Sequence, residues 1–234
     1  MDKYLILLIS FLLFACTENN SNINVAVASN FEKTLATIIE KYNDNNDSLT
    51  INIISASSGT LTTQIVNHAP FDLFLSADIA KPKYIYTQQN IKNKPRIYAI
   101  GKLALWIPAV KNKTDCLKQL SKINTLAIAN PDTAPYGKLA VNILKTNDIT
   151  IDKLVQTANV SQAYLYTKDN LVQAGFVPVS MLKKQAQGCI QTFETKQLSQ
   201  SMILLNNKAS KLYHFILSKE IQTLIKNSGY NTEN

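Results

Sequence analysis

The chain has 234 residues, of which 46% are hydrophobic and 17% charged, a composition that is typical of a globular protein and excludes a disordered or fibrous one. Its formal net charge is +8, but the lysines are scattered along the chain and do not form the concentrated basic stripe of a nucleic-acid-binding protein. We therefore predict a solvated basic surface that helps anions to approach, and no nucleic-acid partner.

The N-terminal residues predict export. Leu5 to Phe14 form an apolar stretch that is too short to span a bilayer, and the segment Leu13-Phe14-Ala15-Cys16 resembles a bacterial lipoprotein signal, in which Cys16 carries the lipid. An ordinary secretory signal with an incidental cysteine is the alternative. We predict a signal peptide over 1–16, a tether over 17–22, and a mature protein that is periplasmic or tethered to a membrane by its lipid.

The first half of the mature chain predicts alternating strands and helices. Phe31, Leu35 and Ile38 recur at helical spacing, which places them on one buried helix face. The expected elements are a strand over 23–27, a helix over 31–42, a strand over 49–54, a helix over 58–65 and a strand over 71–75. This order is typical of an α/β protein with a mainly parallel sheet.

The second half repeats the alternation after a long apolar run over 97–107, which Gly101 interrupts. The elements expected next are a strand over 126–129, a helix over 135–144, a helix from about 159, a strand over 175–179, and one or two helices over 208–230. We predict two lobes with a ligand crevice at the carboxyl ends of their strands. Lobe 1 is expected to comprise 23–100 plus 197–234, and lobe 2 to comprise 101–196.

Small, hydroxyl-rich segments stand where three of these strands give way to helices, at 28–30, 56–59 and 130–137. A helix start presents unpaired backbone N–H groups and the positive end of the helix dipole, so several of them together favour an anion. None of the three segments contains an Arg or a Lys, so dipoles must balance the anion's charge. The expected side-chain donors are the hydroxyls and the amide of Ser29, Asn30, Ser57, Ser58 and Tyr136.

Each of these residues also has a plainer interpretation. Ser29 and Ser58 are suited to capping a helix, and Asn30 to a turn. Tyr136 is equally compatible with a packed ring whose hydroxyl is exposed. Asp72 and Asp78 follow the same strands, but a carboxylate repels an anion, so we expect them to be structural.

Two cysteines, Cys116 and Cys189, remain after Cys16. In an oxidising compartment they are able to form a disulfide, but the sequence gives no distance between them, and two buried or free thiols are the alternative. A metal site built from them and His68 lacks the close spacings of metal-binding motifs, so we expect no direct metal-cation ligands.

Several segments resemble the molybdate-binding proteins of ABC importers, in order, from about residue 24 to 230. The segments that carry this resemblance are Val25-Ala26-Val27-Ala28-Ser29-Asn30-Phe31, Ala69-Pro70-Phe71-Asp72-Leu73-Phe74-Leu75-Ser76-Ala77-Asp78, Gly101-Lys102-Leu103-Ala104-Leu105-Trp106, Leu126-Ala127-Ile128-Ala129-Asn130-Pro131, Ala134-Pro135-Tyr136-Gly137 and Gly175-Phe176-Val177-Pro178-Val179-Ser180.

The resemblance implies a type II periplasmic-binding-protein fold that closes on molybdate or tungstate and needs no other cofactor. It also implies an ABC permease and its ATPase subunit as partners, and we expect a monomer. The site residues that it implies are Ser29, Asn30, either Ser57 or Ser58, Tyr136, and Val160 through its backbone amide. One branch of the family has a tyrosine where this chain has Pro178, which offers neither a hydroxyl nor an N–H.

An enzyme is not expected. The chain has no G-x-S-x-G, P-loop or H-E-x-x-H motif, and His68 and His214 fall outside the predicted turns. A binding protein for sulfate, phosphate or a small organic anion is the main alternative. The ligand-sensing domain of a transcription regulator is disfavoured by the export signal and the lack of a helix-turn-helix segment. Molybdate and tungstate are not ranked, because the two ions have nearly the same size and charge.

Overall fold

The computed structural model describes residues 22–44, 50–111, 115–182 and 186–233, with Lys196 described by its backbone alone. The predicted signal peptide, the predicted lipid site at Cys16 and all of the predicted tether except Asn22 lie outside the described residues. Within the described ranges, no helix is both long enough and apolar enough to cross a membrane.

The strands form one continuous sheet in the order β2-β1-β3-β8-β4-β7-β5-β6. β1 pairs in parallel with β2 and β3 at one end, and β5 pairs in parallel with β6 and β7 at the other. The pairs between them, β3 with β8, β8 with β4 and β4 with β7, are antiparallel. The strands are β1 Ile23–Ala28, β2 Ile51–Ala56, β3 Leu73–Leu75, β4 Arg96–Ile107, β5 Thr125–Ala129, β6 Lys153–Thr157, β7 Ala174–Pro178 and β8 Cys189–Leu204.

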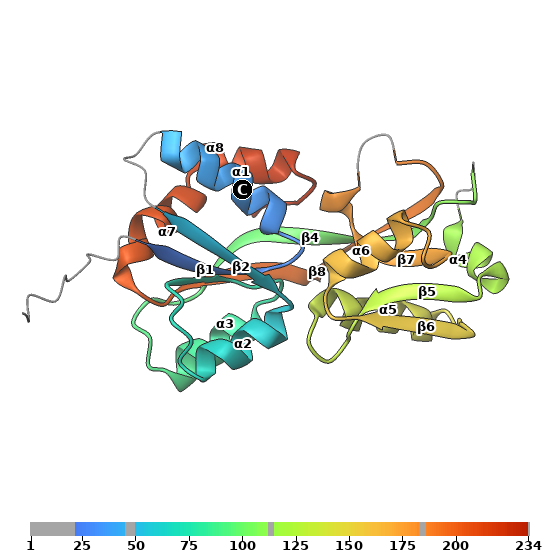
Figure 1. Cartoon of the computed structure of the whole chain (residues 1–234), viewed down its shortest axis with the longest axis horizontal. Helices are drawn as coiled ribbons and strands as arrows, with labels where there is room; N and C mark the ends of the chain where they lie inside the picture. The colour runs from blue at the N-terminus through green and yellow to red at the C-terminus, as the bar shows by residue number, and fades with distance from the viewer. Residues whose placement is uncertain (1–21, 45–49, 112–114, 183–185, 234) are drawn as a thin grey trace, which may run out of the picture.

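The helices lie in two groups, one on each half of the sheet, and the molecule has two lobes, as predicted (Figure 1). Lobe 1 contains β1 to β3 with α1, α7 and α8 on one face and α2 and α3 on the other; lobe 2 contains β5 to β7 with α4 to α6. The long strands β4 and β8 run through both lobes. The helices are α1 Glu32–Asp44, α2 Ser58–Val66, α3 Ala80–Gln88, α4 Cys116–Gln119, α5 Pro135–Thr146, α6 Val160–Lys168, α7 Ser210–Ile216 and α8 Lys219–Asn227.

β1 shows why the parallel strands are almost continuously apolar. Successive side chains point to opposite faces of a sheet, and both faces of lobe 1 are covered by helices. Val25 and Val27 pack into the cluster that includes α1, α7 and α8, whereas Ala26 packs into the cluster under α2 and α3. In lobe 2, Leu126 of β5 packs with α5 residues, and Ala127 packs against α6. Each lobe therefore has a core on both faces of the sheet.

β4 continues through Gly101, which the sequence analysis expected to interrupt the run. Its pairing with β8 extends from Arg96 to Ile107, with register shifts between Ile97 and Ala99 and between Ile100 and Lys102. A Cβ atom at position 101 would collide with the hydroxyl of Tyr136, so the glycine permits Tyr136 to lie close against β4. The chain also returns to this point at its other end, because Ile100 and Asn231 exchange two backbone hydrogen bonds of 2.7 and 2.9 Å.

Cys116 and Cys189 form a disulfide with a Cα–Cα distance of 5.7 Å. It joins the first residue of α4 to the first residue of β8, inside lobe 2. Of the two interpretations left open by the sequence, the structure supports the disulfide.

Candidate functional site

The starts of α1, α2, α5 and α6 converge on one small cavity between the lobes. Every residue predicted for the oxyanion site lies at this cavity, and none of its lining residues has a charged side chain. The lining residues are Ala28, Ser29, Asn30, Ala56, Ser57, Ser58, Ala77, Ala134, Pro135, Tyr136 and Val160.

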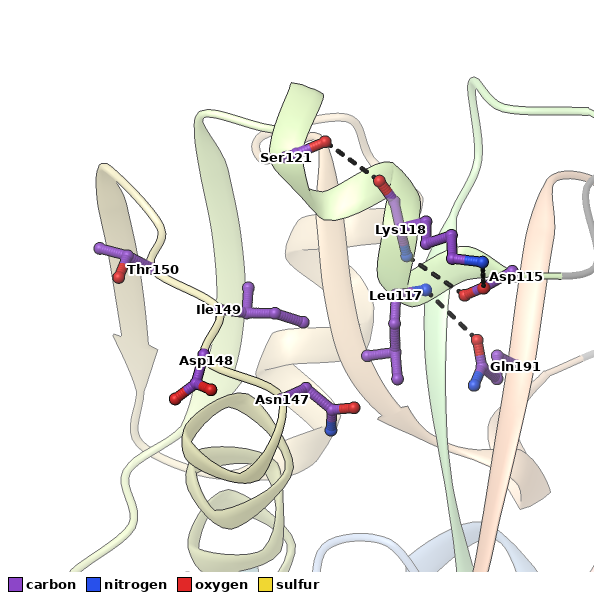
Figure 2. Close-up of a pocket in the computed structure, with 9 residues that line it drawn as sticks. All are labelled: Asp115, Leu117, Lys118, Ser121, Asn147, Asp148, Ile149, Thr150 and Gln191. Atoms are coloured by element: carbon purple, nitrogen blue, oxygen red, sulfur yellow. Dashed lines mark hydrogen bonds and ion pairs between the residues drawn. The ribbon is translucent and has the colours of Figure 1, made fainter.

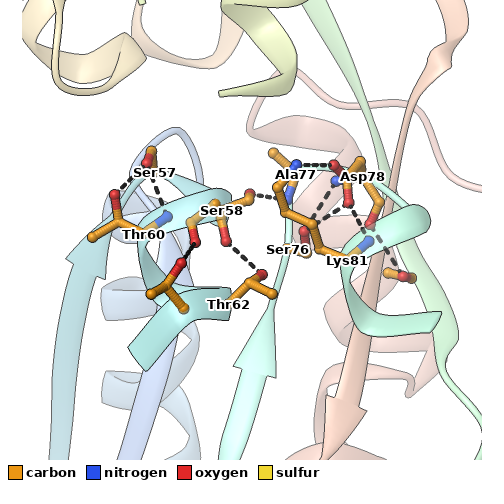
Figure 3. Close-up of polar contacts among 11 residues, drawn as sticks. Ser57, Ser58, Thr60, Thr62, Ser76, Ala77, Asp78 and Lys81 are labelled. Carbon is orange, nitrogen blue, oxygen red and sulfur yellow. Dashed lines mark hydrogen bonds and ion pairs between the residues drawn. The ribbon is translucent and has the colours of Figure 1, made fainter. Parts of the chain in front are cut away.

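The two serines at the start of α2 have different partners (Figure 3). Ser57 is the N-cap: its Oγ accepts a 3.3 Å hydrogen bond from the N–H of Thr60 and lies 2.7 Å from the Thr60 hydroxyl. The Oγ of Ser58 accepts a 2.9 Å bond from the N–H of Ala77 and is not the cap. Since the Ser58 oxygen receives this N–H, its own hydrogen is left to donate to another acceptor.

Ser29 and Asn30 occupy the turn between β1 and α1. α1 begins at Glu32, so Phe31, rather than Ser29, stands immediately before the helix. The backbone of Ser29 donates to Ala56 O at 3.0 Å. The Nδ2 group of Asn30 donates to Gln200 Oε1 at 3.1 Å and to the Tyr230 hydroxyl at 3.3 Å. An anion that uses the Asn30 side chain must therefore compete with partners inside the protein.

Tyr136 is the second residue of α5 and is buried together with its hydroxyl, so the exposed hydroxyl of the alternative interpretation is wrong. The hydroxyl oxygen accepts a 3.1 Å bond from Gln200 Nε2. Burial, reinforced by the neighbouring Tyr230, raises the pKa of Tyr136 well above its usual value. The hydroxyl therefore keeps its hydrogen and remains a donor at neutral pH.

Val160 is the first residue of α6. Asn159 caps this helix by accepting a 3.1 Å bond from the N–H of Gln162. The N–H of a first helical residue has no partner within the helix, so Val160 offers a backbone donor at the cavity.

Direct contacts between the lobes surround the cavity. The N–H of Gly59 in lobe 1 donates to Thr133 O in lobe 2 at 2.8 Å, and the Ser161 hydroxyl donates to Ser29 O at 2.9 Å. A Cβ atom on Gly59 would lie 2.8 Å from Thr133 Cα, so glycine is needed for this approach. The remaining space measures about 10 Å³, far below the roughly 300–1,000 Å³ of pockets for organic ligands. Such a space holds no more than about one water molecule, so the two lobes are in close contact around the site.

The residues that the sequence analysis excluded have other roles. Asp72 forms an ion pair with Lys208 at 3.1 Å, and Asp78 pairs with Lys81 at 2.7 Å. Pro178 ends β7 and pairs in register with β4. None of these three residues, Asp72, Asp78 or Pro178, lines the cavity.

A larger pocket of about 840 Å³ lies in lobe 2, beside α4 (Figure 2). It contains none of the predicted site residues, and its Lys118 is paired with Asp115 at 3.0 Å. The side-chain oxygen of Gln191 is also engaged, because it accepts the N–H groups of Cys116 and Leu117. Its polar groups are thus largely satisfied within the protein. Among the described residues, no group of three or more His, Cys, Asp or Glu side chains is placed to hold a metal ion.

Gln200 is the part of this region that the sequence analysis did not identify. It contacts Asn30 and Tyr136, but it lies on β8, in a segment that resembles none of the turn motifs.

Comparisons with known proteins agree with this geometry. Residues 23–231 match the family model of the bacterial extracellular solute-binding proteins. The molybdate-binding protein ModA of Rhodobacter capsulatus is 32% identical over 223 residues, which cover 89% of this chain and 87% of that protein. ModA of Azotobacter vinelandii is 32% identical over 181 residues, which cover 75% and 71%. The solved periplasmic molybdate-binding protein of Azotobacter vinelandii superposes with a TM-score of 0.76 at 25% identity, over 91% of this chain and 100% of that one. The chain belongs to the family of bacterial extracellular solute-binding proteins that includes the ModA proteins.

Proposed function

We propose that this protein captures molybdate or tungstate outside the cytoplasm and delivers it to an ABC permease and its ATPase subunit. The observation that carries the proposal is the cavity between the lobes, where four helix starts supply hydrogen-bond donors and no charged side chain intrudes. The 32% identity to two ModA proteins supports the choice of ligand.

The donor set suits a tetrahedral dianion, whose four oxygens only accept hydrogen bonds. We assign the ligand role to the Ser58 hydroxyl rather than to Ser57, because Ser57 is engaged as the cap of α2. Ser29, Asn30, Tyr136 and Val160 complete the proposed shell. Backbone N–H groups at the helix starts balance the charge by their dipoles.

The alternative inorganic anions fit less well. Phosphate that keeps a proton needs an acceptor, whereas the Ser58 and Tyr136 oxygens already receive N–H groups from the protein. Sulfate is smaller than molybdate and would leave donors out of reach. Molybdate and tungstate, being nearly equal in size and charge, are expected to bind similarly.

The rest of the proposal concerns organisation and location. We propose lobe boundaries at 23–100 plus 197–234 and at 101–196, which is supported by the register shift between Ile100 and Lys102 in the crossing strands. We also propose a monomer that is periplasmic or tethered to a membrane by a lipid on Cys16.

Isothermal titration of residues 17–234 against molybdate, tungstate, sulfate and phosphate in one buffer tests the proposed function. We expect submicromolar binding of molybdate and tungstate and no heat from the other two ions. Binding of sulfate or phosphate without molybdate would overturn the ligand assignment. Silence from all four ions would overturn the oxyanion site itself.

A further inference from the structure

Gln200 is a fully buried polar side chain at the junction of the two lobes. It lies on β8 opposite Ala99 of β4, close to the register shift between Ile100 and Lys102. Burial of an amide is unfavourable unless its polar atoms are hydrogen-bonded. The partners of Gln200 therefore account for its presence at this position.

The carboxamide of Gln200 joins both lobes. Its Oε1 accepts hydrogen bonds from Asn30 Nδ2 at 3.1 Å and from the Tyr98 hydroxyl at 2.9 Å, both in lobe 1. Its Nε2 donates to the Tyr136 hydroxyl of lobe 2 at 3.1 Å. Gly101 makes room for this bridge, because a Cβ there would collide with the Tyr136 hydroxyl and crowd Gln200 Nε2.

This bridge sets the direction in which Tyr136 donates. A phenolic hydroxyl has one hydrogen, and its oxygen here receives the Nε2–H of Gln200, so the hydrogen is directed away from Gln200. On the lobe 1 side, Gln200 Oε1 and the Tyr230 hydroxyl accept the two hydrogens of the Asn30 Nδ2 group and hold that side chain beside Gln200. Two residues of the proposed anion site, one from each lobe, thus share a single support.

We propose that Gln200 is a positioning residue that directs the Tyr136 hydroxyl toward the anion and holds the Asn30 side chain beside it when the lobes are closed, and so couples closure to affinity. This inference rests on the proposed function, because the ligand of Asn30 and Tyr136 is the oxyanion. If Gln200 only filled space, an apolar side chain of similar size would replace it with no loss of molybdate affinity. If Gln200 positions Tyr136, the same replacement lowers the affinity.

The test is a double-mutant cycle read out by titration with molybdate. Gln200→Met keeps the approximate volume and removes the bridge; we expect affinity about tenfold weaker than that of the parent. In the parent protein, Tyr136→Phe should weaken molybdate binding. If Gln200 acts through Tyr136, the same change should weaken binding by less than about twofold when Gln200→Met is already present.

Gln191→Met is the matched control. Gln191 lies on the same strand and accepts two backbone hydrogen bonds, from Cys116 and Leu117, but is remote from the cavity. We expect this control to lower the melting temperature without changing affinity. Parent-like affinity in Gln200→Met, or fully additive losses in the cycle, would overturn the positioning role while leaving the proposed function standing. Absence of molybdate binding by the parent would overturn both.

Gln200→Glu gives a second readout that a purely structural role does not move. The ionised carboxylate only accepts hydrogen bonds, so it would take the Tyr136 hydrogen. It would also repel the anion, and this repulsion is measured separately as the pH dependence that remains when Tyr136→Phe is added. The protonated carboxyl has a hydrogen to donate and restores the pattern of the glutamine. We expect the affinity of this variant for molybdate to rise as the pH falls from 8 to about 5.5, because burial raises the pKa of a carboxyl group into this range. A pH profile parallel to that of the parent would contradict the proposal.

Discussion

The two lobes contribute to the site in different ways. Lobe 1 brings several side-chain groups, among them the Ser29 and Ser58 hydroxyls and the Asn30 amide, whereas lobe 2 brings one side-chain hydroxyl, that of Tyr136, and the backbone N–H of Val160 at a helix start. Lobe 2 also contains the disulfide, while the described part of lobe 1 is held by its two apolar clusters and the C-terminal helices. Lobe 1 therefore supplies most of the side-chain donors, and lobe 2 supplies a rigid cap that adds one hydroxyl.

The largest effect is expected from removing the disulfide of lobe 2. The double change Cys116→Ala and Cys189→Ala opens a loop with a sequence separation of 73 residues, and we expect a loss of about 4 kcal/mol in the free energy of unfolding. Urea denaturation measures this loss. Alanine avoids burying a new hydroxyl, since both cysteines are fully buried.

The same variant separates stability from binding. Because the disulfide lies outside the cavity, molybdate affinity at low temperature should remain within about twofold of the parent value. Equal stability of parent and variant, or a large loss of affinity in the folded variant, would contradict the division between a lobe that supplies most of the donors and a rigid cap.

The next effect concerns the side-chain donors of lobe 1. Ser58→Ala removes a charge-assisted hydrogen bond worth about 1.5–3 kcal/mol, so molybdate should bind roughly 10- to 150-fold more weakly. Ser57→Ala is the control: loss of the α2 cap should lower stability by about 1 kcal/mol and change affinity little. Titration calorimetry and thermal melts of both variants check this pair. The reverse ranking of affinities would transfer the ligand role to Ser57.

The smallest effect concerns the backbone donor of lobe 2. Val160→Pro removes the N–H at a position where proline is compatible with a helix, because the first helical residue makes no intrahelical N–H bond. The preceding Asn159 is already extended, with φ −155° and ψ 170°, as a residue before proline requires. We expect about tenfold weaker molybdate binding.

Val160→Ala controls for the lost side chain, since it keeps the N–H and should bind like the parent. Equal weakening by alanine and proline would show that packing, and not the backbone donor, is what Val160 contributes.

The elements predicted best from the sequence are those with a simple apolar pattern. β1, α1 and α5 were expected within a few residues of their observed ends, because each buries a continuous strand or one helix face. β6 and β8 were not expected. β6 is largely exposed at the edge of the sheet, so it has no continuous apolar run. β8 passes from the core of lobe 2 into the core of lobe 1 and carries buried polar residues such as Gln200, which interrupt its apolar pattern.

The site residues were predictable to a different degree. Turn chemistry and family resemblance pointed to Ser29, Ser58 and Tyr136, which the structure brings together. The choice between Ser57 and Ser58 needed three-dimensional partners, because the Ala77 N–H that engages Ser58 is 19 residues away. The role of Gln200 could not be predicted from its neighbours in the sequence, because its partners Tyr136 and Asn30 are 64 and 170 positions away.

The return of the chain to the junction at Asn231 has a consequence for how the protein is made. α4, β5, α5, β6, α6 and β7 of lobe 2 lie between β4 and β8 and emerge from the ribosome as one uninterrupted block. Lobe 1 is completed only by β8, by the C-terminal helices and by Tyr230, whose ring packs against Phe31 at a centroid distance of 5.2 Å. The half of the molecule translated first is therefore the last to be finished, which leaves the nascent chain without a complete lobe 1 until β8 and Tyr230 have been made.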